Sequence, residues 1–116
     1  TDDDAQRQFQ RRRRTFAKAL FSPPGNRMTD EQAEELLASP RGAYLNLVFR
    51  YSAVGTTQSV VHKLDAFAAA TGADEIITAH HADHTSSRVH SIALLAEAWS
   101  SESRASQASD NLSAAR

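Results

Sequence analysis

Two short segments that are predicted to be strands constrain the fold of this chain more than any other feature. Residues 52–54 and the run Glu75-Ile76-Ile77-Thr78-Ala79 each indicate a strand, and each is followed by apolar residues at helical spacing. The order strand, helix, strand, helix predicts a parallel α/β fold. Parallel strands are normally buried on both faces, and a sheet of two strands cannot provide that burial. The sequence therefore predicts that the remaining strands of the sheet come from elsewhere.

Two helices are predicted before these strands. Thr1 is a suitable N-cap for the first helix, and Ser22-Pro23-Pro24-Gly25-Asn26 ends it, because two prolines and a glycine cannot continue a helix. Thr29 is a suitable N-cap for the second helix, which ends at Ser39-Pro40-Arg41-Gly42. The apolar residues that recur at helical spacing in these two helices are Phe9, Phe16, Leu20, Ala33, Leu36 and Leu37.

Three further helices are predicted around the two strands. A short helix runs from Ala43 to about Arg50. Thr56 is the N-cap of the next helix, and Gly72 supplies the left-handed position that follows it. Thr85 or Ser86 is the predicted N-cap of the last helix, which carries Val89, Ile92, Ala93, Ala96 and Trp99 on one face. The face of the preceding helix is formed by Val60, Val61, Leu64, Phe67 and Ala68.

The composition argues against several classes of protein. The formal net charge of −1 gives no overall attraction to nucleic acid or to an anionic membrane. The chain has no cysteine, which removes disulfides and thiolate catalysis and fits a reducing compartment. No apolar run approaches the roughly 18 to 20 residues of a membrane span. The prediction is a soluble, cytoplasmic protein that does not bind membranes.

Residues 100–116 differ from the rest of the chain. They consist of Ser, Ala, Asn, Gln and charged residues with a single leucine. Such a segment buries too little apolar surface to offset the entropy lost on ordering. We therefore predict a domain over residues 1–99 and a disordered tail over residues 100–116.

Three stretches of the second half resemble a known family in their order and spacing. The chain has V-G-T-T-Q-S-V at 54–60, T-G-A-D-E at 71–75 and S-I-A-L-L-A-E-A at 91–98. These resemble V-G-S/T-P-E-S/T-V, T-G-A-D-E and S-Y-E-L-L-A-E-A of the luciferase-like, flavin-dependent monooxygenases, the family of bacterial luciferase. The start T-D-D-D-A is similar to a T-D-E-E-A of the same family. The chain departs from the pattern at Thr57, where proline is usual, and at Ile92-Ala93.

The resemblance implies a (β/α)8 TIM barrel, a fold of about 250 residues or more. Residues 1–99 would be its C-terminal part, with about two parallel strands and three or more helices, and would be helix-rich in isolation. The family implies reduced flavin mononucleotide (or a deazaflavin), a flavin reductase or other flavin supply, dioxygen and a small organic substrate. A homodimer is compatible with the family. The flavin contacts of the family lie in earlier segments, so no cofactor-binding residue is assigned here. The isolated chain is expected to bind no flavin and to be inactive.

His80 and His81 are the candidate active-site residues. They follow the predicted strand 75–79 at its C-terminal end, where barrel enzymes place their sites. There one of the two would line the mouth of the site and transfer protons or shape the substrate pocket. A polar loop that only covers the rim is the alternative. With Asp83 and His84 they offer possible metal ligands, but the spacing matches no standard zinc pattern and no metal is predicted.

Two other functions stay open. Exposed edges of short strands favour a small, non-enzymatic binding or regulatory module that pairs with a partner or with itself. The run Arg11-Arg12-Arg13-Arg14 suggests a nucleic-acid patch, but consecutive arginines spread around a helix and no groove-reading motif accompanies them. We therefore expect a solvated outer helix face, with arginine stems lying over apolar neighbours, and no nucleic-acid partner.

Overall fold

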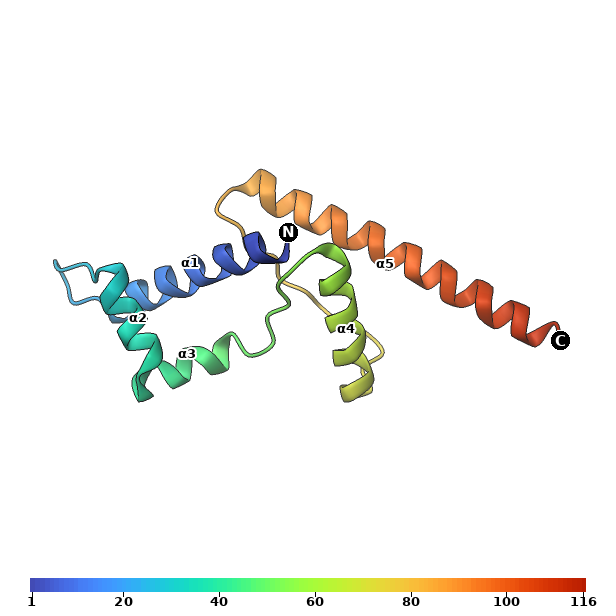
Figure 1. Cartoon of the computed structure of the whole chain (residues 1–116), viewed down its shortest axis with the longest axis horizontal. Coiled ribbons are helices and arrows are strands. Elements are labelled where there is room, and N and C mark those ends of the chain that lie inside the picture. Colours follow the sequence, from blue (N-terminus) through green and yellow to red (C-terminus); the bar gives the residue numbers. More distant parts are fainter. The chain divides into compact units, whose positions relative to one another are not determined.

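The computed structural model describes residues 1–116, apart from the side chains of Arg104 and Gln107, and divides them into two compact units (Figure 1). The first unit is Thr1–Gly55 and the second is Thr56–Arg116. Every regular element among the described residues is a helix. No described helix has both the length and the apolar character needed to cross a membrane.

The first unit begins with the predicted long helix, α1 (Asp2–Phe21). Thr1 is its N-cap, because the Thr1 hydroxyl accepts a hydrogen bond from the Asp4 backbone N–H at 3.2 Å. The acidic residues of the first turn lie at the positive end of the helix dipole. The helix ends where the Ser22 N–H bonds to the Lys18 carbonyl, directly before the two prolines.

The second helix, α2 (Asp30–Ala38), is also confirmed, and Thr29 forms a complete capping box. The Thr29 hydroxyl accepts from the Gln32 N–H at 3.2 Å, and the Gln32 side-chain oxygen accepts from the Thr29 N–H at 2.9 Å. A short 3-10 turn, η1 (Pro40–Gly42), leads into α3 (Ala43–Val48). This last helix is shorter than the predicted one and passes into turns up to Tyr51.

A small apolar core joins these helices. Phe49, just after α3, meets the rings of Phe9 and Phe16 edge-on, with centroids 5.6 and 5.4 Å apart. α2 packs against α1, η1 and α3. The buried members of the core are Ala17, Ala33, Leu37 and Leu45, and Phe16, Phe21, Met28 and Leu36 pack around them.

Gly42 lies where η1 approaches the end of α2. A Cβ atom at this position would be 2.3 Å from the Leu36 carbonyl oxygen and 2.7 Å from the Leu37 Cα. These atoms belong to the backbone and cannot rotate away. The packing of η1 on α2 therefore requires glycine at residue 42.

The second unit consists of α4 (Thr57–Thr71) and α5 (Thr85–Ala114), which pack against each other. Thr56 caps α4, and Gly72 ends it in the left-handed conformation with φ +66°, as predicted. Val61 of the predicted apolar face is buried. α5 begins at Thr85 with His84 as N-cap and no capping side-chain bond, so neither Thr85 nor Ser86 is the cap.

The predicted strands are absent from the described residues. Residues 52–54 and 75–79 have no strand assignment, and Ile77 is 93% exposed. A helix satisfies its own backbone groups, whereas a strand exists only beside another strand. The two segments lie in different units, and neither has a partner strand within its unit. The prediction of an α/β chain with two parallel strands, forming part of a (β/α)8 barrel, is therefore wrong for this structure.

Residues 100–116 are helical as far as Ala114, because α5 continues through them. Apart from Arg104 and Gln107, whose side chains lie outside the description, all of these residues are exposed. A helical segment without a packed face is marginal in water. The disordered tail stays a prediction.

Candidate functional site

His80, the first candidate from the sequence, is held between two hydroxyl groups. Its Nδ1 lies 2.8 Å from the Ser91 Oγ on α5, and its Nε2 lies 3.2 Å from the Thr78 Oγ1. In a neutral imidazole one ring nitrogen donates and the other accepts, and a hydroxyl can take either role. The contacts therefore orient the half-buried His80 ring and connect the irregular segment 73–84 to α5.

The described residues around His80 do not form a metal-binding cluster. His81 is exposed, and no three His, Asp or Glu side chains within the described part of the chain come together in a way that would hold a metal ion. The two bonds of His80 go to hydroxyls, so this cluster lacks the carboxylate that orients a catalytic histidine in a triad. The placement of His80 and His81 at an active-site mouth stays a prediction.

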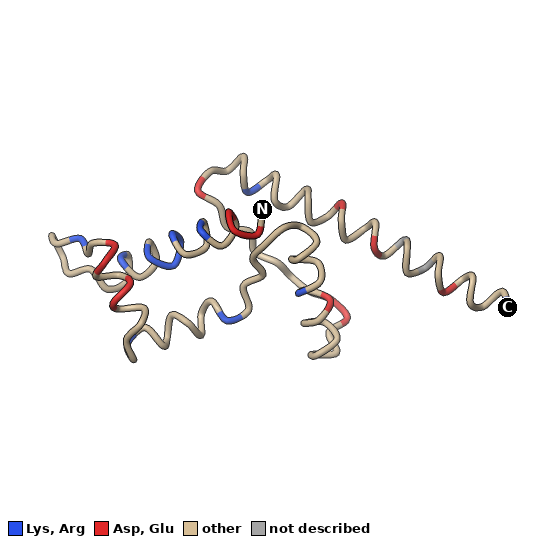
Figure 2. The backbone as a smooth tube through the Cα atoms, viewed as in Figure 1, with Lys and Arg blue, Asp and Glu red and all other residues tan. Residues whose placement is uncertain are grey.

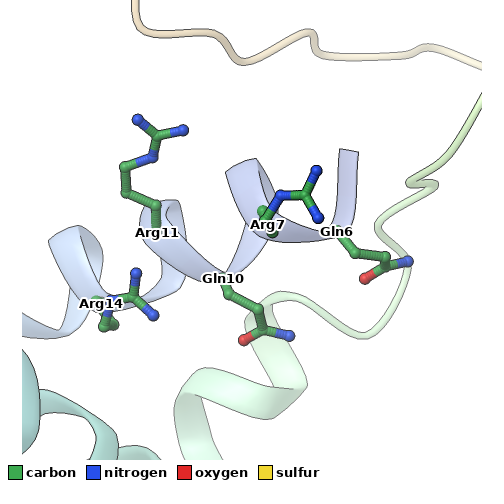
Figure 3. A pocket seen from close by; sticks show the side chains of 5 residues that line it. All are labelled: Gln6, Arg7, Gln10, Arg11 and Arg14. Atoms are coloured by element: carbon green, nitrogen blue, oxygen red, sulfur yellow. The ribbon is translucent and has the colours of Figure 1, made fainter. Parts of the chain in front are cut away.

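A basic face on α1 is the second candidate. Lys and Arg recur along this helix (Figure 2), and Arg7, Arg11, Arg14 and Lys18 follow the spacing i, i+4, i+7, i+11 of one helix face. An open hollow on this helix is lined by Gln6, Arg7, Gln10, Arg11 and Arg14. The side chains spread apart in Figure 3 instead of converging on one point.

Acidic residues neutralise most of this basic face. Arg7 pairs with Asp4, and Arg14 donates to the Glu34 carboxylate of α2 at 2.7 Å. Lys18 pairs with Asp30 at the start of α2. Paired arginines and lysines have less charge available for a polyanion, which weakens the case for nucleic-acid binding.

The predicted solvated arginine face is accordingly correct only in part. Arg11 is exposed, but the Arg14 side chain is 26% exposed and paired with α2. Arg13 donates to the side-chain oxygens of Gln10 and of Asn46 in α3. Two of the four consecutive arginines thus tie α1 to its neighbours. The i, i+4, i+7 spacing of the basic residues was visible in the sequence. The acidic partners of Lys18 and Arg14 lie 12 and 20 residues away and were not marked by any local pattern.

The ion pair between Lys18 and Asp30, at the start of α2, lowers the pKa of Asp30. The hydrogen bond from the Lys18 ammonium holds the pKa of the Asp30 carboxyl below its usual value, and the charges of Lys18 and Arg14 act in the same direction. A lowered folded-state pKa stabilises the fold above the unfolded-state pKa of about 3.9. This contribution is lost as the pH falls through the folded-state pKa.

Replacing Lys18 with methionine is therefore expected to raise the pKa of Asp30 toward its usual value. Methionine keeps the apolar stem but removes the ammonium donor. Carboxyl NMR shifts followed from neutral pH to acid would measure this change. Asp4 provides the internal control, because hydrogen bonds from Thr1 and Arg7 lower its pKa and Lys18 does not contribute. An unchanged Asp30 titration in the variant would show that the pair does not form in solution.

The hollow on α1 gives no support for a flavin site. The hollow on α1 is lined by arginine and glutamine side chains open to solvent, which does not match an aromatic isoalloxazine ring. No step of flavin chemistry is therefore assigned to a residue of this chain. Comparison of the chain with protein-family models, with curated proteins and with solved structures finds no match.

Proposed function

We propose that this chain is one part of a flavin-dependent monooxygenase that uses reduced flavin and dioxygen to oxidise a small organic substrate. The observation that carries this proposal is the ordered resemblance of residues 54–60, 71–75 and 91–98 to the luciferase-like family. The cofactor would be flavin mononucleotide or a deazaflavin, delivered by a flavin reductase or another flavin supply. The flavin itself would perform the oxygen chemistry, and the protein would position the substrate and exclude water.

The local structure of the motif residues supports the proposal. Thr56 caps α4 within the first motif, and Gly72 ends α4 within the second. The third motif lies wholly inside α5. Thr56 and Gly72 thus fix the two ends of α4, and their motifs occur in the same order as in the family.

The uncovered apolar surface supports the idea that the chain works together with another polypeptide surface. Leu47 is 62% exposed and Ile77 is 93% exposed, and Tyr44, Tyr51 and Val89 are also largely exposed. The buried core consists of five residues only among those described: Ala17, Ala33, Leu37, Leu45 and Val61. The same surface supports the second candidate, a non-enzymatic binding module that associates with a partner or with itself.

Flavin binding by the longest natural polypeptide that contains this chain tests the proposal. We expect that polypeptide to bind reduced flavin mononucleotide or a reduced deazaflavin saturably in an anaerobic absorbance titration. The present chain alone is expected to leave the fluorescence of oxidised flavin mononucleotide unchanged. A matched control is the longer polypeptide lacking residues 54–116.

Failure of the longer polypeptide to bind either reduced cofactor would reject the flavin function and leave the binding module. Saturable binding by the present chain alone would show that the cofactor site lies within residues 1–116. That result would contradict the assignment of no cofactor-binding residue to this segment.

A further inference from the structure

One side of α3 and of the turn that follows it is apolar and exposed. Tyr44, Leu47, Val48 and Tyr51 recur at the spacing i, i+3, i+4, i+7, and each is between 49% and 72% exposed. We call these four residues the α3 face. An apolar stripe with this spacing normally packs against a second helix or against the core. In the first unit the stripe instead lies at the surface, and a group of exposed apolar side chains of this kind marks a site for another molecule.

The contacts between α3 and α1 lie on the other side of α3. Leu45 is fully buried, Phe49 meets two phenylalanine rings of α1 edge-on, and Asn46 accepts a hydrogen bond from Arg13. Each residue of a helix is rotated by about 100° from the one before it, so residues 45, 46 and 49 point away from the α3 face. These contacts therefore hold α3 on α1 without covering the α3 face.

The charges beside the α3 face indicate the chemistry of its partner. Arg41 precedes α3 and Arg50 follows it, and both are exposed. Neither arginine forms an ion pair with any residue that the structure describes. Each guanidinium lies over an aromatic ring, a contact that leaves its charge intact. Residues 36–64 contain no Asp or Glu, so the chain on both sides of the α3 face is positively charged.

These charges distinguish among the molecules that could cover the α3 face. A second copy that docks its own α3 face here brings arginines toward arginines, and like charges oppose association. An anionic membrane attracts the two arginines but not the chain as a whole, whose formal net charge is −1. A helix with an apolar stripe of matching spacing and with carboxylates beside that stripe complements both the shape and the charge.

We propose that the α3 face binds an amphipathic helix of another protein whose apolar stripe is flanked by Asp or Glu. The apolar side chains of that helix pack on Tyr44, Leu47 and Val48, and its carboxylates accept hydrogen bonds from Arg41 and Arg50. This inference deepens the second candidate function, the binding module, by naming its partner. It depends on residues outside the three family-like motifs, so it holds or fails independently of the flavin chemistry.

Two synthetic peptides test the charge requirement on the full chain. Both carry leucines at the spacing i, i+3, i+4, i+7, and the stripe is flanked by glutamates in one and by lysines in the other. Fluorescence anisotropy of each labelled peptide, titrated with the chain, measures its affinity. We expect saturable binding of the glutamate peptide and at least about tenfold weaker binding of the lysine peptide. Arg41→Glu with Arg50→Glu is expected to reverse this preference. The matched control, Arg11→Glu with Arg27→Glu, changes the net charge equally at two exposed sites and is expected to retain it.

Leu47→Asp tests the apolar requirement. We expect this variant to bind the glutamate peptide at least about tenfold more weakly, whereas Leu112→Asp, at an exposed leucine of α5, is expected to bind it as the original chain does. Helical circular dichroism confirms that each variant is folded. No saturable binding of the glutamate peptide, or equal binding of the two peptides, overturns the proposal. It is also overturned if Leu47→Asp abolishes a dimer seen by sedimentation velocity, which would assign the face to a second copy, or abolishes binding to phosphatidylserine vesicles, which would assign it to a membrane.

Discussion

Replacement of Leu45 by alanine is expected to unfold residues 1–55. Leu45 is fully buried and lies in one cluster with Ala17, Ala33 and Leu37. Truncation of a buried leucine costs about 2 to 5 kcal/mol, since it loses apolar burial and leaves a cavity. A single core in a unit as small as Thr1–Gly55 rarely supplies more than about 3 to 5 kcal/mol of net stability. The stability lost in Leu45→Ala is therefore comparable to the whole free energy of unfolding of the first unit.

Urea titrations with two probes measure this effect. Far-ultraviolet circular dichroism follows the helices of both units, whereas the single tryptophan, Trp99, lies in α5 of the second unit. We expect the variant to lose part of its helical signal before urea is added, while the Trp99 transition changes little.

Leu47→Ala is the matched control for this experiment. Leu47 lies two residues further along α3 and is 62% exposed. The same truncation there is expected to change stability by no more than a few tenths of a kcal/mol. Equal losses for Leu45→Ala and Leu47→Ala would show that the packing of the first unit is not the one described.

Gly42→Ala is expected to have the second large effect. The new methyl group would lie 2.3 Å from the Leu36 carbonyl oxygen and 2.7 Å from both the Cα and the carbonyl oxygen of Leu37. To remove this overlap, η1 must move away from the end of α2. That movement loosens the packing around the buried Leu37. Overpacking of this kind typically costs about 1 to 3 kcal/mol. Thermal unfolding followed by circular dichroism would show the loss.

Gly72→Ala separates steric overlap from backbone strain. Gly72 has φ +66°, and no atom lies within 4 Å of the position that a methyl group would take, so only its left-handed conformation opposes alanine. That conformation costs an alanine about 1 to 2 kcal/mol. We expect this variant to weaken the second unit, as reported by Trp99, without affecting the first. A Gly42→Ala protein with unchanged unfolding would contradict the close approach of η1 and α2.

The sequence was most informative where structure depends on neighbours along the chain. Thr29 was predicted as the N-cap of α2 and is confirmed; the reciprocal bond from Gln32, three residues later, was not predicted although it is equally local. Gly72 could be placed for the same reason, because a left-handed position after a helical face favours glycine. The helices from 2 to 21 and from 57 to 71 were predicted with nearly correct ends.

The sequence was misleading where structure depends on distant partners. The composition of residues 75–79 favours a strand, but no local property supplies the neighbouring strand. Phe49 was predicted to lie in the short helix from Ala43 to about Arg50, but it lies just after α3 and its ring contacts are with Phe9 and Phe16, more than 30 residues earlier. At the candidate sites, the sequence indicated His80 but not Ser91, the α5 residue that holds its ring.

The contacts that tie α1 to its neighbours also bear on how quickly the chain acquires its structure. Lys18 meets Asp30 across 12 residues, Arg14 meets Glu34 across 20, and Arg13 meets Asn46 across 33. Even with these longer-range contacts, a small unit made of helices is expected to fold in microseconds to milliseconds, because most contacts within helices are between near neighbours. Ribosomes add only about 5 to 20 residues per second. Residues 1–55 can therefore finish folding during translation, while residues 56–116 are still being synthesised.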